Sequence, residues 1–351
     1  MILQKPSITE DDIRAVGEAL KTGWLGTGEI TRKFEQAVLP YTGHSHCAAT
    51  SSCSAAIEVA LRITDVKDKE VITSPNTFCA TVNAIIRAGG IPRFVDITED
   101  GLMDAALLES SITARTRVVM PVHFAGKVVD LSAIKCLKEL SIIEDCAHTL
   151  GANLPESDNI RCFSFYPTKP VTTIDGGLIS CNDSEFIEKA RILTQQGVNN
   201  NAWERKNGTK ISSVLEVGMK ANMPNVNASL GLSQLARFDA MQKRRREIFR
   251  ILDGRFERAW HKEGDSCHLY CFLTDKRDLL LNELSTREII TGIHYLPVHL
   301  QPAYQYLGYK RGDFPMAEKW GNTELTLPTN PEMTDEDVRF IIDSVKEIIH
   351  G

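Results

Sequence analysis

The sequence lacks the motifs of several large enzyme classes. No GxGxxG follows a first predicted strand, which argues against a nucleotide-binding dehydrogenase, and the missing Walker A motif argues against NTP hydrolysis. None of the nine cysteines forms a CxxC pair. No apolar run approaches the roughly 18 residues of a membrane span, so we expect no membrane association.

A strong excess of charge is also missing. The 351 residues carry 40 Lys and Arg against 46 Asp and Glu, a formal net charge of -6. This balance argues against a general nucleic-acid binder. The basic run at residues 243–246 (KRRR) could form a phosphate-binding patch, but we favour the solvated face of a helix that begins near Ser233.

Metal-ligand spacing and a secretory signal are absent as well. His44 and His46 have no third and fourth ligand at a recognisable spacing, so we expect no metal site. Residues 1–4 (MILQ) do not begin a secretory signal. We therefore expect reduced thiols and a cytoplasmic protein.

What the sequence does contain is an alternation of short apolar runs and helical patterns. Between the runs lie amphipathic stretches such as residues 79–88 and 132–140. This alternation predicts a mostly parallel sheet covered on both faces, with ligands beyond the carboxyl ends of its strands. The predicted strands are residues 70–73, 92–96, 117–122, 141–144, 161–165 and 177–180.

The remaining third of the chain has a different pattern. We predict one long helix or two in series over residues 225–252, stopped at Asp253 and Gly254. Strands are expected at 267–273 and 290–295, and a terminal helix at 334–349. The chain is long for a single core, so we predict an α/β protein with a large domain, 1–236, and a smaller C-terminal α+β domain, 237–351.

Lys169 is the most informative residue. It follows a predicted strand within residues 164–169 (SFYPTK), is bracketed by hydroxyl groups, and is followed by Gly176 and Gly177. A lysine in this position is placed like one that forms a Schiff base with a carbonyl compound. Such a lysine needs a polar floor for a phosphate and an acid to tune the partner's ring.

Asp145 is the candidate acid. It ends the apolar run at residues 140–143 and lies 24 residues before Lys169, which leaves room for one helix or loop and the next strand. A carboxylate at the end of a buried strand needs a cation or strong donors, and a protonated pyridine nitrogen would serve. The alternative is an Asp that caps a helix beginning at Cys146; this motif alone does not decide between them.

Residues 50–55 (TSSCSA) are the candidate phosphate floor. A helix is predicted to open at Ser54, with Ser51 and Ser52 as possible caps, and small residues let backbone amides approach an anion. Ser164 could add a hydroxyl donor. Plain capping and a satisfied strand-end serine are the alternatives. Phe78 follows a predicted strand and could stack on a ring, or could belong to the core.

Over nearly its whole length the chain resembles the DegT/DnrJ/EryC1/StrS family of sugar aminotransferases. The resemblance implies a type I aminotransferase fold with a mostly parallel seven-stranded sheet, and pyridoxal 5'-phosphate (PLP) as cofactor. It also implies homodimers whose active sites each borrow residues from the neighbour. The motifs that carry it are residues 23–28 (GWLGTG), 144–152 (EDCAHTLGA), 164–169 (SFYPTK), 175–177 (DGG), 292–295 (GIHY) and 297–302 (PVHLQP).

The resemblance also implies roles for single residues. Lys169 would form the Schiff base with the cofactor and Asp145 would pair with the pyridine nitrogen. His148 would contact the phenolic oxygen of the ring, and Phe78 would stack on the ring.

Further cofactor and substrate positions follow from the same resemblance. Lys220 falls where many members use an asparagine that reaches the partner's cofactor phosphate. The matching phosphate-binding positions are Cys53, Ser54 and Ser164, and the expected substrate-side residues are Trp24, Tyr295 and His299, each of which could instead serve only in packing.

Three departures from the family pattern concern the phosphate and the substrate. Cys53 and Ser54 replace the common Gly-Thr, which puts one amide contact in doubt. Asp175 stands where Glu is usual and Asn222 where Arg is frequent. None of the three removes a chemically indispensable group.

The implied activity is transfer of an amino group, with glutamate as the expected donor, to a ketone on a nucleotide-linked sugar. A dTDP- or UDP-linked 4-keto-6-deoxyhexose is the first expectation and a 3-keto sugar the alternative, in a pathway such as lipopolysaccharide or O-antigen biosynthesis. The family's sugar 3-dehydratases carry His in place of the lysine, so Lys169 argues against dehydration. A non-catalytic regulatory role is the remaining alternative.

Overall fold

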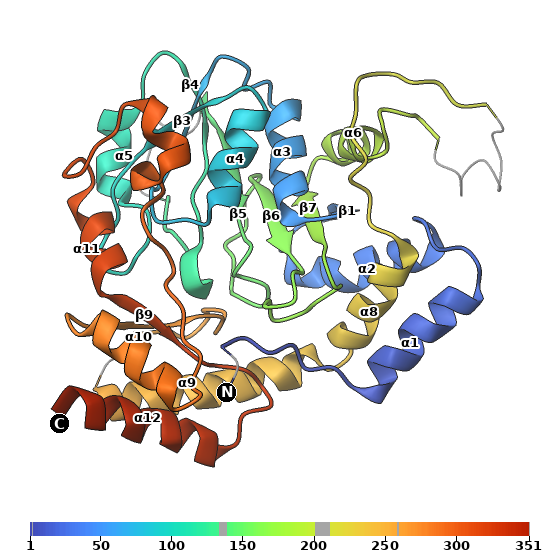
Figure 1. Cartoon of the computed structure of the whole chain (residues 1–351). Coiled ribbons are helices and arrows are strands. Elements are labelled where there is room, and N and C mark those ends of the chain that lie inside the picture. The colour runs from blue at the N-terminus through green and yellow to red at the C-terminus, as the bar shows by residue number, and fades with distance from the viewer. Residues whose placement is uncertain (2, 133–138, 201–210, 258–259, 351) are drawn as a thin grey trace.

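A computed structural model describes residues 1, 3–132, 139–200, 211–257 and 260–350 (Figure 1). A seven-stranded sheet has the order β1-β7-β6-β5-β4-β2-β3. Only β7 runs antiparallel to its neighbours, so the predicted mostly parallel sheet is confirmed. Its strands are β1 (His46–Thr50), β2 (Glu70–Thr73), β3 (Ile91–Phe94), β4 (Thr116–Val119), β5 (Ser141–Asp145), β6 (Ile160–Ser164) and β7 (Gly177–Cys181).

Helices cover both faces of this sheet because its central strands are apolar on both sides. Successive residues of β6 show this: Cys162 packs among α3 and α6, whereas Phe163 packs among α2 and α8. The helices of this part of the chain are α1 (Glu10–Lys21), α2 (Glu29–Val38), α3 (Cys53–Ile63), α4 (Cys79–Arg87), α5 (Ala105–Ser111), α6 (Ser184–Thr194) and α8 (Asn225–Leu235), with short 3-10 turns η1 (Leu39–Tyr41) and η2 (Phe124–Gly126).

The six strands predicted for this sheet are all present, with ends shifted by at most three residues. The strand at 70–73 is reproduced as predicted, and β1 is the strand that was not foreseen. Its sequence, HCAAT, has almost no branched apolar residues, and its pairing with β7 joins segments about 130 residues apart. Most of the predicted helix at 132–140 lies outside the described residues.

The C-terminal part joins helices to a two-stranded antiparallel sheet, and α9 lies beside α12 (Figure 1). The predicted helix over 225–252 is two helices in series, and the second runs past Gly254 because the left-handed turn comes only at Glu257 (φ 51°). The elements are α9 (Phe238–Phe256), β8 (Tyr270–Leu273), α10 (Arg277–Thr286), η4 (Val298–Leu300), η5 (Pro302–Leu307), α11 (Pro315–Thr323), β9 (Glu324–Leu327) and α12 (Asp335–His350).

The strand predicted at 290–295 is wrong apart from a single bridge between Gly292 and Thr326. Beyond that bridge the backbone N–H of His294 donates to the carboxylate of Glu324 (2.6 Å) instead of continuing a ladder. This departure from the strand brings the next side chains to the cavity described below.

The basic run at 243–246 is not simply a solvated face. Arg245 is 3% exposed and donates to Thr329 O (2.7 Å) and Gln4 Oε1 (3.2 Å). Arg244 donates to Met333 O and to Asp335. The solvated-face interpretation is therefore wrong for Arg245, which holds α9 to the segment before α12.

The core of the C-terminal part extends into the sheet region. One apolar cluster joins Phe94 and Phe124 to α9, α12 and both strands of the small sheet. The division at residue 237 thus stays a prediction. Within the described residues no cysteine forms a disulfide, and no helix combines the length and apolar content needed to cross a bilayer.

Candidate active site

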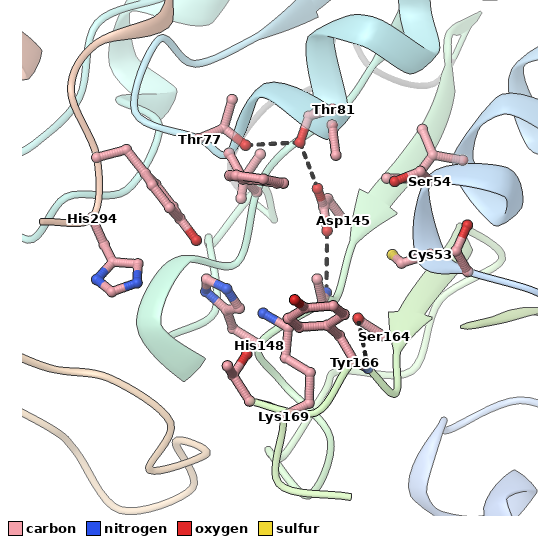
Figure 2. Close-up of a pocket in the computed structure, with 18 of the residues that line it drawn as sticks. Cys53, Ser54, Thr77, Thr81, Asp145, His148, Ser164, Tyr166, Lys169 and His294 are labelled. Atoms are coloured by element: carbon pink, nitrogen blue, oxygen red, sulfur yellow. Dashed lines mark hydrogen bonds between the residues drawn. The ribbon is translucent and has the colours of Figure 1, made fainter. Parts of the chain in front are cut away.

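A cavity of about 610 Å³ opens where β5 and β6 end, between the N-termini of α3 and α4 and the segment after Gly292 (Figure 2). Parallel strands bring their carboxyl ends to one edge, which is where ligands of such sheets bind. Eight residues predicted from the sequence line it together: Cys53, Ser54, Phe78, Asp145, His148, Ser164, Lys169 and Tyr295.

Asp145 is buried at the end of β5, and its hydrogen-bond donors among the described residues are neutral. Its Oδ2 accepts from Thr81 Oγ1 (2.8 Å) and its Oδ1 from Ala147 N (3.1 Å) (Figure 2). Burial raises the pKa of Asp145, and the hydrogen bond from Thr81 opposes that rise. No helix begins at Cys146, so the helix-cap alternative is wrong. A cation bound in the cavity could form an ion pair with this carboxylate.

Lys169 lies in the turn after β6 and extends its amine into the same cavity. Burial lowers the pKa of Lys169 to about 8, against the opposing effect of Cys53 and Asp145. More of this amine is therefore uncharged near neutral pH than in an ordinary lysine. Uncharged amines are the form that attacks carbonyl carbons.

His148 lies on the turn after Asp145 and presents a defined tautomer. Its Nδ1 accepts a hydrogen bond from Ala125 N (3.1 Å), and its ring lies 4.6 Å from that of His268. Burial, together with the charge of Lys169, lowers the pKa of His148 well below its usual range. The ring is therefore neutral with its proton on Nε2, which makes Nε2 a hydrogen-bond donor.

The N-terminus of α3, where the sequence predicts a phosphate site, lies at the cavity. Ser52 caps the helix by accepting from Ala55 N (3.2 Å), and Ser54 lines the cavity beside it. A Cβ at Gly177 would come within 2.5 Å of Cys53 N, so only glycine lets β7 lie this close to the helix. The Cys53 thiol contacts Cys162 O (3.5 Å), and burial raises its pKa well above the usual range.

Aromatic rings form another wall of the cavity. Phe78 occupies the N-cap position of α4 and is 57% exposed, so it does not belong to the core. Its ring lies 5.8 Å from that of Tyr295. Tyr166 lines the cavity beside Lys169, although it was not among the predicted site residues. These faces could enclose a flat ring.

The structure does not bring every predicted residue to this cavity. Trp24 and Lys220 line a second cavity of about 400 Å³, and Lys220 Nζ donates to Asn222 there (2.6 Å). His299 is buried and lies 3.2 Å from Glu318 through Nε2, outside both cavities. Packing is therefore the interpretation that its contacts favour.

Sequence reasoning missed residues that contact the predicted ones. Thr77 and Thr81 form a hydrogen-bonded pair that leads to Asp145, and His294 lines the cavity beside Tyr295. A signal for Thr81 existed, since it lies one helical turn after Phe78 at the start of a helix that follows a strand. His294 lies in the motif at residues 292–295 (GIHY), but no role was predicted for it.

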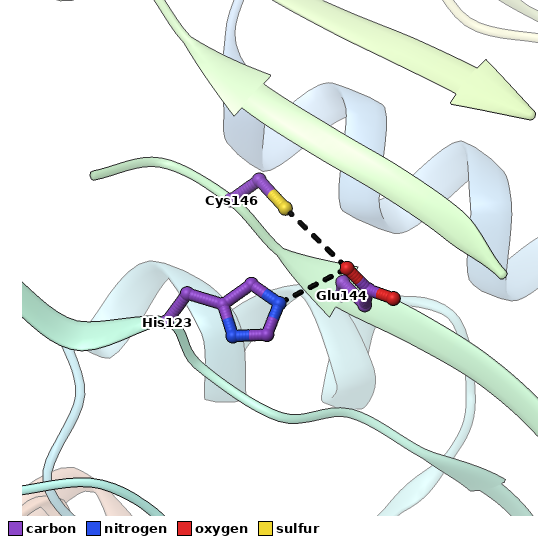
Figure 3. A group of neighbouring side chains, drawn as sticks. All are labelled: His123, Glu144 and Cys146. Atoms are coloured by element: carbon purple, nitrogen blue, oxygen red, sulfur yellow. Dashed lines mark hydrogen bonds and ion pairs between the residues drawn. The ribbon is translucent and has the colours of Figure 1, made fainter. Parts of the chain in front are cut away.

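One buried cluster has residue types that could bind a metal, namely His123, Glu144 and Cys146 (Figure 3). The oxygens of Glu144 already accept from His123 Nε2 (3.0 Å), Arg161 Nε (2.9 Å) and Asn159 Nδ2 (2.5 Å). Although burial opposes ionisation, these bonds and the charge of Arg161 lower the pKa of Glu144 to about 2. The charge partner of Glu144 is therefore Arg161, which would repel a metal ion.

The main cavity fits PLP. Asp145 forms no ion pair with any described residue, so a pyridinium could pair with it, and Lys169 offers an amine for the aldehyde. The N-terminus of α3, with Ser54, offers donors for the phosphate. His148 Nε2 is a neutral donor suited to an anionic oxygen.

Comparisons with known proteins agree with this geometry. A model of the DegT/DnrJ/EryC1/StrS aminotransferase family matches residues 6–346. The chain is 37% identical to the spore coat polysaccharide biosynthesis protein SpsC of Bacillus subtilis (strain 168), over 99% of this chain and 96% of that protein. It is 33% identical to the UDP-4-amino-4-deoxy-L-arabinose–oxoglutarate aminotransferase of Shewanella sediminis, over 99% and 97%.

A solved structure has the same fold. Spr1654 of Streptococcus pneumoniae, in its PLP-form, superimposes with a TM-score of 0.90 at 30% identity, over 99% of this chain and 98% of that one. The predicted type I aminotransferase fold is thereby confirmed.

The buried pair behind Asp145 should dominate local stability. We expect Arg161→Met to lower the free energy of unfolding by about 3–5 kcal/mol in urea denaturation, because Glu144 would stay buried without its charge partner. The matched control is Arg62→Met, whose partly exposed pair with Glu58 should contribute about 0–1 kcal/mol. Equal losses in the two variants would contradict this account.

The lowered pKa of Lys169 predicts how fast the cofactor-free protein captures PLP. Since the uncharged amine reacts, the capture rate should rise with pH up to about 8 and then level off. The reference is the reaction of PLP with Nα-acetyl-lysine amide, whose rate depends in the same way on the ionisations of PLP itself. The rate of this reference reaction should keep rising with pH toward the ordinary lysine pKa. A protein profile that rises as far as the model amine does would show that Lys169 is unperturbed.

Proposed function

This chain belongs to the DegT/DnrJ/EryC1/StrS aminotransferase family, whose cofactor is PLP, and we propose that it transfers the amino group of glutamate to a keto group of a nucleotide-linked sugar. The observation that carries the proposal is the placement of Lys169 and Asp145 in one cavity, an amine of lowered pKa beside a buried carboxylate that forms no ion pair with any described residue. A family member that had lost catalysis would not need either group.

Bound PLP supplies an electron sink for the carbon that loses its proton. Asp145, held by Thr81 and Ala147, would keep a proton on the pyridine nitrogen and so preserve the sink. His148, whose Nδ1 accepts from Ala125 N, would donate from Nε2 to the phenolic oxygen. The Lys169 amine would accept the proton that leaves the α-carbon of the donor.

The substrate class is supported by the relatives. The Shewanella sediminis relative is named for a UDP-linked amino sugar and oxoglutarate, the keto acid that glutamate leaves behind. For this chain we propose a dTDP- or UDP-linked 4-keto-6-deoxyhexose as acceptor, with a 3-keto sugar as the alternative. Tyr295 and Phe78 would lie beside the sugar or beside the cofactor ring that the sugar contacts.

We also propose a homodimer whose partner covers the second cavity. Lys220 and Trp24 line that cavity, which is separate from the cavity of Lys169. They could therefore contribute to an active site only if they reach the active site of the neighbouring chain. The segment just before Lys220 exposes large apolar side chains, with Val217 87% exposed, which a monomer would leave in water. Action in the cytoplasm, expected from the cysteine usage, stays a prediction.

The first test is the absorption spectrum of protein reconstituted with PLP. We expect the wild type to show the yellow bound form and to bleach on addition of glutamate, whereas Lys169→Ala should lose both changes because no amine remains to hold the cofactor or move the proton. Lys67→Ala, at a surface lysine, is the control. A wild type that binds PLP but reacts with no amino acid would favour the regulatory alternative.

The second test concerns the acceptor. The protein, converted by glutamate to its aminated form, should regain the yellow form with a 4-keto-6-deoxyhexose linked to dTDP or UDP, faster than with the 3-keto isomer. Mass spectrometry of the amino sugar identifies the product. Preference for the 3-keto isomer would correct the proposed position and leave the reaction class intact.

A further inference from the structure

His294 lines the catalytic cavity, and several hydrogen bonds fix its backbone and its ring there. Its backbone N–H donates to Glu324 Oε2 (2.6 Å) and its carbonyl accepts from Trp320 Nε1 (2.9 Å). A Cβ at Gly292 would come within 3.1 Å of the imidazole, so glycine at that position makes room for the ring. The direction of the ring is thus set by the surrounding fold.

The side chain of His294 begins a short hydrogen-bond chain that leads away from the cavity. Its Nδ1 lies 2.7 Å from Thr326 Oγ1, and Thr326 Oγ1 donates to Glu324 Oε1 (2.5 Å). A hydroxyl has one proton, so a threonine that donates to a carboxylate can only accept from the imidazole. The proton of a neutral His294 therefore lies on Nδ1.

This arrangement leaves Nε2 of His294 as a lone-pair nitrogen. No partner for it is found among the residues that the structure describes, and the ring faces the cavity (Figure 2). Burial lowers the pKa of His294 to about 4, and the charge of Lys169 acts in the same direction. At neutral pH the group offers the cavity an acceptor and no positive charge.

His148 is the opposite tautomer. Its Nδ1 accepts from Ala125 N, so its Nε2 carries the proton. The cavity therefore holds two neutral imidazoles, one that donates and one that accepts, each fixed by contacts outside the cavity. An acceptor of this kind cannot bind the carboxylates of glutamate or a phosphate, but it can bind an O–H or N–H group.

We propose that His294 Nε2 accepts a hydrogen bond from an O–H or N–H group of the bound substrate, and that Thr326 and Glu324 are positioning residues that fix this acceptor form. The proposal rests on the proposed function, because a sugar hydroxyl and the amino group of the donor are the two groups of this kind that such a site receives.

Thr326 donates to Glu324, and so accepts from His294, only when Glu324 is ionised. Burial raises its pKa to about 7, and the groups that face it are Thr326, the Cys271 thiol on β8, and Arg277 on α10. Lys169 is the charged group that faces His294. The test is therefore made at pH 8, where Glu324 is charged.

The first experiment reads the tautomer without using activity. Histidine labelled with nitrogen-15 is introduced into the PLP-loaded protein, and His294→Phe identifies the signals of His294. We expect Nδ1 to carry the proton and Nε2 to show the shift of a lone-pair nitrogen. Thr326→Ser should keep this pattern, whereas Thr326→Val should lose it. A proton on Nε2 in the wild type would overturn the proposal.

The second experiment measures the two half-reactions separately, one with glutamate and one with the nucleotide-linked keto sugar. Loss of one neutral hydrogen bond should slow the affected half-reaction about three- to tenfold in Thr326→Val and in His294→Phe, with Thr326→Ser close to wild type. A loss with glutamate identifies the amino group as partner, and a loss only with the sugar identifies a hydroxyl.

The outcomes distinguish the role of His294 from the aminotransferase activity itself. Half-reactions unchanged in Thr326→Val and His294→Phe would overturn the role of His294 and leave the aminotransferase intact. Failure of the wild type with every amino donor would overturn the proposed function, while the tautomer pattern would still be decided by the spectrum.

Discussion

A buried carboxylate with no ion-pair partner among the described residues is the constraint on which the rest of this site depends. Asp145 ends a strand whose neighbours are packed on both faces, and it is 5% exposed. Two neutral donors, Thr81 and Ala147, keep its oxygens in place without neutralising them. The free energy of that unpaired charge is recovered when a cationic ring enters, which links the fold of the sheet edge directly to cofactor affinity.

The lysine is surrounded by imidazoles that do not compete with it for protons. Burial and the charge of Lys169 lower the pKa of His148, His268 and His294 together, so the amine is the group of the cavity that exchanges protons near neutral pH. The histidines act instead as fixed dipoles. An enzyme that must move one proton between two carbons gains from having a single mobile proton carrier.

Much of this could be predicted from the sequence, for identifiable reasons. Six of the seven strands were foreseen because buried strands are short, largely apolar runs, and Asp145 and Lys169 were foreseen because polar residues at the ends of such runs are unusual. The strand β1 was missed because alanines and a cysteine carry no strand signal. His294 could not be predicted, since its role depends on Thr326 and Glu324, which meet it only through the tertiary fold.

The cysteine at the first turn of α3 has a consequence for how the protein tolerates oxidants. Cys53 places a thiol against the cofactor cavity, and a thiolate there would be open to peroxide and to electrophiles. Its sulfur is instead packed against Cys162 O and stays protonated, and the protonated thiol is the unreactive form. The sheet therefore shields the cofactor site from redox damage by the same packing that brings the helix close to β7.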